Sequence, residues 1–279
     1  MILKTFHILN NSAEPIHNDL RHREDAKGAP VIIIVHGFKG FKNWGFFPDL
    51  SERLAMAGYV TLTPNFSRNG IGYDYNTFEH LDKFAENTHS HEMKDLQMVI
   101  DHICSEKIGK RTIDVERIAL LGHSRGGGTA ILKAAELGDR ITCIVTWASV
   151  STFFRFDDSQ IAQWKKAGFI EIENSRTKQM MRMNKAYWDD LYKNKYDILK
   201  AAKVLENPAL FIHGQEDTSV SPKDSQEIHD ICASYVKRLE LIENTGHTFG
   251  ITHPMEKASQ EYEMACLFTE SWFDNYLNI

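Results

Sequence analysis

Residues 117–128 read Arg-Ile-Ala-Leu-Leu-Gly-His-Ser-Arg-Gly-Gly-Gly, and this stretch decides the fold. Its apolar run at 118–121 is typical of a strand buried on both faces of a parallel sheet. Residues 129–137 have the pattern of a helix. Between them lies Gly-x-Ser-x-Gly, which is typical of a sharp strand-to-helix turn that exposes a serine. We therefore predict that Ser124 projects from a turn so tight that only glycine fits on either side of it.

The segments on either side alternate between strand and helix patterns. Further strands are predicted at 31–35, 59–63, 141–148, 208–212 and 238–242, and further helices at 48–57, 86–107, 222–234 and 255–277. This alternation predicts an α/β fold with a mostly parallel, doubly wound sheet and helices on both faces. Residues 2–9 and 16–23 predict an antiparallel hairpin at the edge of the sheet. Such an exposed edge could pair with a second copy, so a homodimer is possible.

Chemistry at a serine requires partners elsewhere in the chain. A hydroxyl becomes a good nucleophile when a base removes its proton, and that base needs a carboxylate to orient it. Two later turns offer these groups directly after predicted strands, where open α/β sheets build their sites. One turn, His-Gly-Gln-Glu-Asp, ends at Asp217, and the other, Thr-Gly-His, ends at His247. Upstream, the strand at 31–35 runs into a His-Gly-Phe turn that ends at Phe38 and could supply a backbone N–H to an oxyanion.

Together these motifs resemble the α/β-hydrolase superfamily of serine hydrolases, whose triads follow the chain order serine, acid, histidine. The resemblance runs from about Val31 to His247 and through the last helix. The spacing and the Gly-His-Thr-Phe-Gly stretch most resemble the dienelactone-hydrolase-like and peptidase-like esterase branches. The resemblance implies one domain over residues 1–279, with a core at 1–148 and 204–279. A helical lid insertion is then expected at about 149–203.

The resemblance also implies roles for particular residues. Ser124 becomes the nucleophile, His247 the base and Asp217 the acid, while the backbone N–H groups of Phe38 and Arg125 form the oxyanion hole. The implied reaction is hydrolysis of a small-molecule carboxylic ester or acyl substrate through an acyl-enzyme. This reaction requires no cofactor and no metal.

Other residues compete for these roles. His213, His123 and His253 are the alternative bases, and the first two are interpreted as structural hydrogen-bonding groups at strand ends. Glu216 and Asp224 are the alternative acids.

Four more side chains each have a functional and a structural interpretation. The guanidinium group of Arg125 could contact a substrate carboxylate, or it could pack or pair away from the site. His89, His91 and His102 lie on or near the helix predicted at 86–107, and we expect surface or capping roles for them rather than metal ligation.

The motifs leave the reaction partly open. Thioesterases, small-peptide hydrolases and acyltransferases use the same triad. Haloalkane dehalogenases and epoxide hydrolases carry an aspartate at the position of Ser124, which excludes them. A non-catalytic binding module is the alternative from another class, although such proteins usually lose a triad member. The expected lid could bind an apolar acyl or aryl group through a few of its aromatic and methionine side chains, which are Phe153, Phe154, Phe156, Trp164, Phe169, Met180, Met181, Met183, Tyr187, Trp188 and Tyr192.

Composition limits the possible partners and location. The 279 residues are 42% hydrophobic and 25% charged, which is ordinary for a globular protein. A net charge of −6 with scattered basic residues predicts no nucleic-acid or membrane partner. No apolar run reaches the roughly 18 residues of a membrane span, and the N-terminus is too polar for a secretory signal. Because the four cysteines are far apart, we expect reduced thiols and a cytoplasmic protein.

Overall fold

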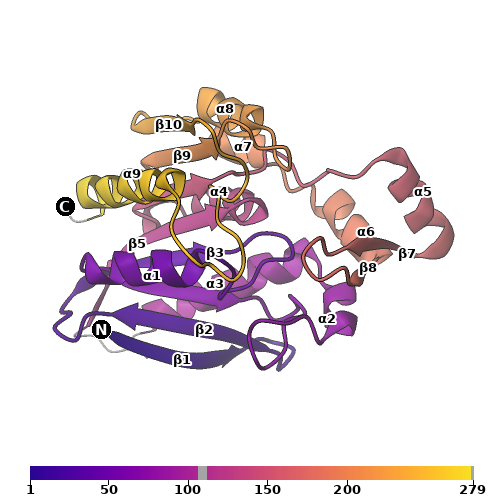
Figure 1. The fold of residues 1–279 in the computed structure, drawn as a ribbon, viewed down its shortest axis with the longest axis horizontal. Helices are drawn as coiled ribbons and strands as arrows, with labels where there is room; N and C mark the ends of the chain where they lie inside the picture. The colour runs from indigo at the N-terminus through magenta and orange to yellow at the C-terminus, as the bar shows by residue number, and fades with distance from the viewer. Residues whose placement is uncertain (106–111, 278–279) are drawn as a thin grey trace.

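In the computed structural model, which describes residues 1–105 and 112–277, an eight-stranded sheet forms the centre of the molecule (Figure 1). The strand order is β1-β2-β4-β3-β5-β6-β9-β10. Neighbours from β4 to β10 are parallel, and β2 is antiparallel to both β1 and β4. The predicted α/β class with a mostly parallel sheet is therefore confirmed. The bounds are β1 (Ile2–Leu9), β2 (Pro15–His22), β3 (Ala29–Val35), β4 (Val60–Asn65), β5 (Ile113–His123), β6 (Cys143–Trp147), β9 (Ala209–Gly214) and β10 (Lys237–Ile242).

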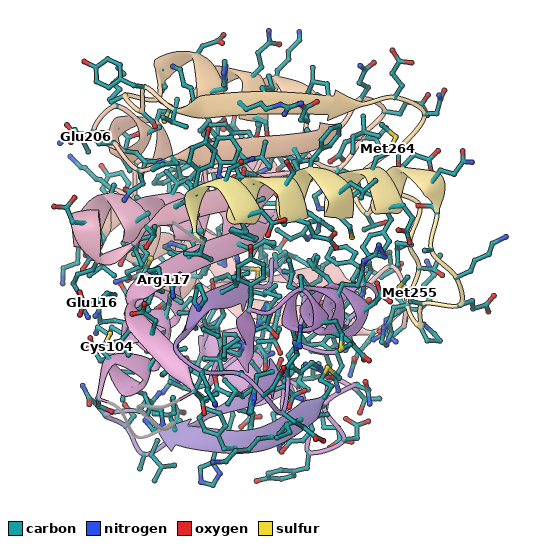
Figure 2. All side chains as sticks on the ribbon, turned by 90° about the vertical axis from the view of Figure 1, so that its left-hand side faces the viewer. Cys104, Glu116, Arg117, Glu206, Met255 and Met264 are labelled. Carbon is teal, nitrogen blue, oxygen red and sulfur yellow. The ribbon has the colours of Figure 1, made fainter. Side chains whose placement is uncertain are left out.

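Helices cover both faces of this sheet because alternate strand residues point to opposite sides. Ile32 and Ile34 of β3 pack with α1 (Phe47–Met56) and α9 (Gln260–Tyr276). Val31 and Ile33 pack on the other side, toward α3 (His89–Cys104), α4 (Arg125–Leu137) and α8 (Pro222–Ile231). Figure 2 shows α9 beside α1, with Met255 in the loop that leads into α9.

The chain between β4 and β5 departs from the predicted single helix at 86–107. The helix there, α3, begins at His89 rather than at residue 86. A short helix that was not predicted, α2 (Leu81–Glu86), precedes it, and Asn87 and Thr88 separate the two. Thr88 begins α3 with a capping box, because its side chain accepts from the His91 backbone N–H while His91 Nδ1 accepts from the Thr88 backbone N–H. The predicted end of the helix at Lys107 lies outside the described residues.

Other predicted boundaries also move. β6 begins at Cys143 rather than at residue 141, and α8 ends at Ile231 rather than at residue 234. The last helix begins at Gln260 rather than at Met255, because the Ser259 side chain accepts from the Tyr262 backbone N–H and caps the first turn.

Residues 149–203 connect β6 to β9, and we call them the crossover segment. They form α5 (Asp158–Ala167), β7 (Phe169–Glu173), β8 (Met180–Asn184), α6 (Lys185–Asn194) and α7 (Ile198–Ala202). The three helices agree with the helical insertion predicted from the sequence, but the antiparallel β7–β8 hairpin was not predicted. In Figure 1, α5, α6 and this hairpin project together from one side of the sheet.

The predicted N-terminal hairpin is confirmed, and β1 is an edge strand of the sheet. The homodimer that this edge would allow stays a prediction. Among the described residues, each helix is too short or too polar to cross a bilayer. The cytoplasmic location also stays a prediction.

Candidate active site

Ser124 occupies a strained turn between β5 and α4. Its φ of 57° and ψ of −122° lie outside the regions that residues with a side chain usually adopt. A Cβ atom at Gly122 would lie 2.2 Å from the Gly126 carbonyl oxygen, and one at Gly126 would lie 2.3 Å from the Val35 carbonyl oxygen. The two glycines are therefore required by close backbone contacts, as the sequence predicts.

Backbone hydrogen bonds hold this turn in place. The Ser124 N–H donates to the Trp147 carbonyl at the end of β6, at 2.8 Å, and the Ser124 carbonyl accepts from the Gly127 N–H at 3.0 Å. Helix α4 begins at Arg125, so Ser124 lies at a helix N-terminus, where the aligned peptide dipoles favour negative charge.

Asp217 and His247 come together from the turns after β9 and β10. His247 Nδ1 lies 2.7 Å from Asp217 Oδ2. The other carboxylate oxygen accepts from the backbone N–H groups of Ser219 and Val220, at 2.8 and 2.9 Å. Burial alone would raise the pKa of Asp217, but hydrogen bonds from His213 and His247 outweigh burial and hold that pKa below its usual range. Asp217 is therefore ionised at neutral pH, and His247 donates its Nδ1–H to the carboxylate.

His213 is the second imidazole on this carboxylate. Its Nε2 lies 3.1 Å from Asp217 Oδ2 and 3.0 Å from the Val220 carbonyl, which are both acceptors, so Nε2 carries the proton. Its Nδ1 then accepts from the Ser225 hydroxyl at 2.7 Å. The fully buried His213 thus orients Asp217, which matches the structural role suggested by its sequence position.

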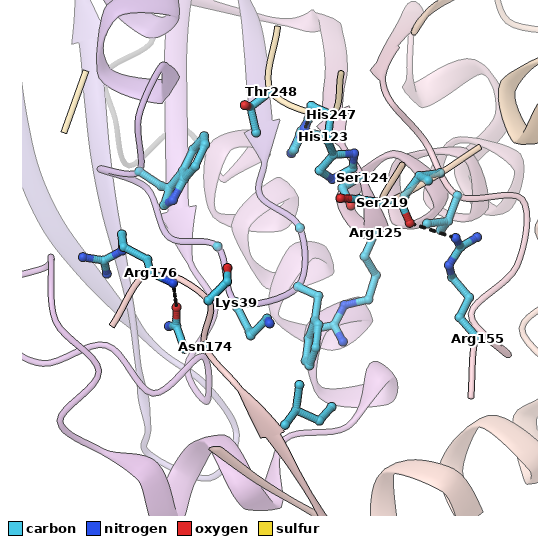
Figure 3. A pocket seen from close by; sticks show the side chains of 18 of the residues that line it. Lys39, His123, Ser124, Arg125, Arg155, Asn174, Arg176, Ser219, His247 and Thr248 are labelled. Atoms are coloured by element: carbon cyan, nitrogen blue, oxygen red, sulfur yellow. Dashed lines mark hydrogen bonds between the residues drawn. The ribbon is translucent and has the colours of Figure 1, made fainter. Parts of the chain in front are cut away.

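Ser124 and His247 line the same cavity of about 700 Å³ (Figure 3). Both are half-buried, so a substrate can reach them. Within the described residues no hydrogen bond joins the Ser124 hydroxyl to the His247 imidazole. Catalytic hydrogen bonds are often long before a substrate binds and shorten when it does.

The His-Gly-Phe turn after β3 packs directly against the serine. A Cβ atom at Gly37 would lie 2.9 Å from the Ser124 Cβ and 3.3 Å from the Arg125 backbone nitrogen. In the described part of the chain, neither the Phe38 N–H nor the Arg125 N–H donates to another protein group. The two amides expected to form an oxyanion hole are thus near the serine and available to a ligand.

The Arg125 side chain takes the pairing role of its two possible interpretations. Its guanidinium donates to Glu92 Oε1 at 2.5 Å and to the Tyr187 hydroxyl at 3.3 Å, and it lies over the Phe38 ring. Burial alone would raise the pKa of Glu92, but Arg125 and His89 lower it to about 2. This ion pair was not predicted from the sequence, although Glu92 on the apolar side of a predicted helix was a usable signal.

The rival bases occupy other positions. His123 donates from Nε2 to the His247 carbonyl at 2.9 Å, and burial lowers its pKa to about 3 with a further contribution from the neighbouring His247. His253 Nδ1 accepts from the Gly45 N–H at 2.9 Å, and its ring stacks on Trp44.

Among the described residues, neither rival acid makes a hydrogen bond or ion pair with His247. The Glu216 side chain is exposed. Asp224 pairs with Arg155 at 2.7 Å and accepts from the Ser151 N–H.

The expectation for the three histidines of α3 is correct for His91, which caps the helix, and wrong for His89. His89 is fully buried between the rings of Phe153 and Tyr196, with centroids 3.9 and 4.6 Å away. Its neighbour Glu92 has an oxygen 3.7 Å from His89 Nδ1. The third, His102, is half-buried and stacks on Phe6 of β1. His89 escaped prediction because the crossover segment, distant in sequence, is what buries it.

Part of the crossover segment faces the serine. Three of its aromatic residues line the cavity, namely Phe153, Phe156 and Tyr187. Trp164 and Met181 are instead fully buried within the segment. This division agrees with the expectation that only a few of the aromatic and methionine side chains reach a pocket.

Several known proteins are similar to this chain in sequence. The sequence model of the prolyl oligopeptidase family matches residues 48–277. A relative from Bacillus subtilis (strain 168), named "Putative esterase YitV", is 26% identical over 263 residues, which cover 94% of this chain and 93% of the relative. A further relative, from Mycoplasma pneumoniae, is named "Putative esterase/lipase 2" and is 26% identical over 64% of this chain and 80% of its own length.

Solved structures show the same fold. Est1E from Butyrivibrio proteoclasticus with bound ferulic acid has a TM-score of 0.74 at 16% identity, covering 98% of this chain and 100% of that one. A monoglyceride lipase from Saccharomyces cerevisiae, bound to a substrate analogue, has a TM-score of 0.72 at 19% identity, covering 99% and 95%. The predicted α/β-hydrolase fold is confirmed.

Proposed function

The chain belongs to the prolyl oligopeptidase family and is an esterase- and lipase-like α/β-hydrolase, and we propose that it is a serine esterase. It hydrolyses carboxylic esters with Ser124 as the nucleophile, His247 as the base and Asp217 as the acid. The observation that carries this proposal is the 2.7 Å hydrogen bond between the buried, ionised Asp217 and His247, which lines the same cavity as Ser124.

The tautomer of His247 sets the order of proton transfers. Because its Nδ1–H donates to Asp217, its Nε2 carries the lone pair that accepts the Ser124 proton. The serine oxygen attacks the ester carbonyl, and the resulting oxyanion accepts from the backbone N–H groups of Phe38 and Arg125. His247 then gives its proton to the leaving alcohol. In the second step His247 deprotonates water, which releases the acid from Ser124.

The crossover segment acts as a lid that selects the substrate. Phe153 and Phe156 line the cavity together with Val150 and Ile172, so they offer an apolar surface to an acyl or aryl group. Est1E, with its bound ferulic acid, supports an ester with an aromatic part as one candidate substrate.

A test compares turnover of 4-nitrophenyl esters of increasing chain length by wild type and Ser124→Ala. We expect the variant to lose at least about 10³-fold in kcat, because nothing replaces the serine oxygen. Ser175→Ala is the matched control, since Ser175 lines the same cavity without any role in the mechanism. Turnover by Ser124→Ala at close to the wild-type rate would refute the proposal.

Small-peptide hydrolysis is the second candidate, and the family match favours it. An amide leaving group requires the same proton from His247, so the triad serves both reactions. Parallel assays with 4-nitrophenyl esters and 4-nitroanilides of the same acyl group separate the two. Higher kcat/KM on the anilides would identify a peptidase instead of an esterase.

A further inference from the structure

The walls of the cavity carry a charge opposite to that of the whole protein. The sequence has 38 acidic and 32 basic residues, yet the cavity is lined by Lys39, Arg125, Arg155 and Arg176 and by no Asp or Glu of the described residues. A cleft lined with one sign of charge raises the local concentration of ligands of the other sign. The cavity is therefore built to attract anions.

Two of the four cations already have carboxylate partners. Arg125 pairs with Glu92 at 2.5 Å, and Arg155 pairs with Asp224 at 2.7 Å. Within the described chain, Lys39 and Arg176 have no carboxylate oxygen within 4.0 Å. The carboxylate of Glu173, which is close to Lys39 in space, pairs instead with Lys178 at 3.0 Å.

Lys39 is the unpaired cation that adjoins the proposed oxyanion hole in the sequence. It directly follows Phe38, whose backbone N–H is a proposed oxyanion donor. In the view of Figure 3, Lys39 lies between Arg125 and two residues of the β7–β8 loop, Asn174 and Arg176. Its ammonium group donates to the Glu173 carbonyl at 3.1 Å and lies 5.5 Å from the Phe38 ring centroid. Because an ammonium has three N–H donors, two have no partner in the described part of the chain.

The backbone also makes Lys39 an unusual place for a lysine. Its φ of 56° lies in the left-handed region, which glycine and asparagine adopt far more readily than lysine does. The side chain is half-buried, and burial lowers the pKa of its ammonium group. Strained backbone and half-buried charge both oppose folding, and such features concentrate at functional sites.

From this arrangement we propose that the preferred substrate is an ester that carries an ionised acid group, a carboxylate in the simplest case, and that Lys39 binds that group. The proposal rests on the proposed esterase function and names the class of ester. Arg176, exposed at the cavity wall, adds to the positive potential that draws the anion in. Lys39 thus determines specificity, while Ser124 and His247 carry out the reaction.

A purely structural role for Lys39 is the competing explanation. Its hydrogen bond to the Glu173 carbonyl joins the loop after β3 to the β7–β8 hairpin, so Lys39 could merely hold the crossover segment in place. Loss of such a tie would affect charged and neutral esters equally. Loss of an anion-binding group would affect the charged esters alone.

The experiment measures kcat/KM for matched pairs of esters. One pair is 4-nitrophenyl hydrogen adipate and its neutral methyl ester, with the charge on the acyl side. The other is 4-acetoxybenzoate and its methyl ester, with the charge on the leaving group. We expect wild type to prefer the anionic member of at least one pair by about tenfold or more, which is the size of one charge-assisted hydrogen bond.

Variants at Lys39 then show whether this side chain causes the preference for anionic esters. Lys39→Met keeps the chain length and should lose about tenfold on the preferred anionic ester while changing less than about twofold on its neutral partner. Lys39→Arg should retain the preference. Lys166→Met, at an exposed lysine of α5 outside the cavity, is the matched control and should change neither rate.

Equal losses on charged and neutral esters in Lys39→Met, or no anionic preference in wild type, would overturn this proposal and leave the esterase function standing. If wild type hydrolyses no ester at all, the proposed function fails instead. In that case, titration calorimetry with adipate tests the anion-binding site independently of catalysis. Binding that weakens in Lys39→Met would support the site, and the absence of binding to wild type would overturn it.

Discussion

The turn at Ser124 and the crossover segment meet across one cavity, but different forces hold them. Backbone groups fix the turn, since the Ser124 N–H donates to a β6 carbonyl and a Cβ on either flanking glycine would overlap backbone oxygens. The first part of the crossover segment shares this backbone network, since the Val150 N–H donates to the Ser124 carbonyl at 3.3 Å. The hydrogen bonds from its described residues 157–197 to the body each involve a side chain. Asp190 accepts from the Ser90 hydroxyl and N–H at 2.6 and 2.9 Å, and Tyr187 accepts from Arg125 at 3.3 Å.

This difference separates the chemistry from the choice of substrate. Backbone contacts tolerate almost no substitution, so the reacting groups are held in one geometry. Side-chain contacts can be exchanged one at a time, so the surface that meets the substrate can change without disturbing the serine. We therefore expect substitutions in the turns of the sheet to abolish activity and those in the crossover segment to shift specificity.

The largest effect is expected at Asp217. Asp217→Asn leaves the size of the side chain unchanged but removes the acceptor that fixes the His247 tautomer, so kcat should fall by about 10⁴-fold. Steady-state kinetics on a short-chain 4-nitrophenyl ester measures this. Glu216→Gln, at an exposed neighbour, should match wild type. A loss of less than tenfold in Asp217→Asn would mean that another group orients the base.

Glycine substitutions compare the two regions directly. Gly126→Ala places a methyl group against the Val35 and His36 carbonyl oxygens, so we expect a loss of about 3 kcal/mol in unfolding free energy together with most of the activity. Gly168→Ala, at the end of α5, meets no atom within 4 Å and only strains a φ of 78°. Its cost should be about 1–2 kcal/mol, with activity kept. Urea unfolding measures the loss of stability, and ester turnover measures the loss of activity. Equal effects at Gly126 and Gly168 would contradict the proposed difference between the Ser124 turn and the crossover segment.

Glu92 tests the junction between the two regions. Its pKa falls from 4.5 to about 2 in the folded protein. A carboxyl group whose pKa is lower in the folded state stabilises the fold fully at pH values above its unfolded-state pKa. This stabilisation is lost as the pH falls through its folded-state pKa. Glu92→Gln should therefore cost on the order of 3 kcal/mol at pH 7 and about half of that at pH 3.

Urea unfolding at the two pH values measures this change, with Glu227→Gln at an exposed site of α8 as the control. A cost that is the same at pH 7 and pH 3 would show that the Glu92 charge makes no contribution to stability.

The smallest effect is expected from Phe156→Ala. Phe156 lines the cavity and packs edge-on against Trp164 at 4.7 Å between centroids. Its loss should raise KM for aryl esters by about tenfold and leave acetyl esters within about twofold. Tyr192→Ala, at a side chain that is 68% exposed in the same segment, is the control. A uniform fall in kcat for every ester would show that the crossover segment also positions the serine.

The sequence predicted the body of the sheet and the turns of the candidate site because their signals are local. A serine between glycines, a carboxylate after an apolar strand and a Gly-His turn each identify their own backbone conformation. Their order then places Ser124, Asp217 and His247 at one edge of a parallel sheet.

What escaped prediction depends on contacts between distant segments. The β7–β8 hairpin has five-residue strands, which are too short for alternation to stand out. The start of α3 at His89 rather than at residue 86 depends on the Thr88–His91 capping box, and the short helix α2 before it was not predicted. The buried position of His89 and the cationic lining around Lys39 arise only when the crossover segment folds over the body.

The most direct test of the central claim is to find which residue a fluorophosphonate probe modifies. Folded wild-type protein is labelled, digested and mapped by mass spectrometry, with protein unfolded before labelling as the control. The account predicts an adduct on Ser124 that is absent from the unfolded protein and strongly reduced in His247→Gln. An adduct on a different serine, or none on well-folded wild type, would contradict it.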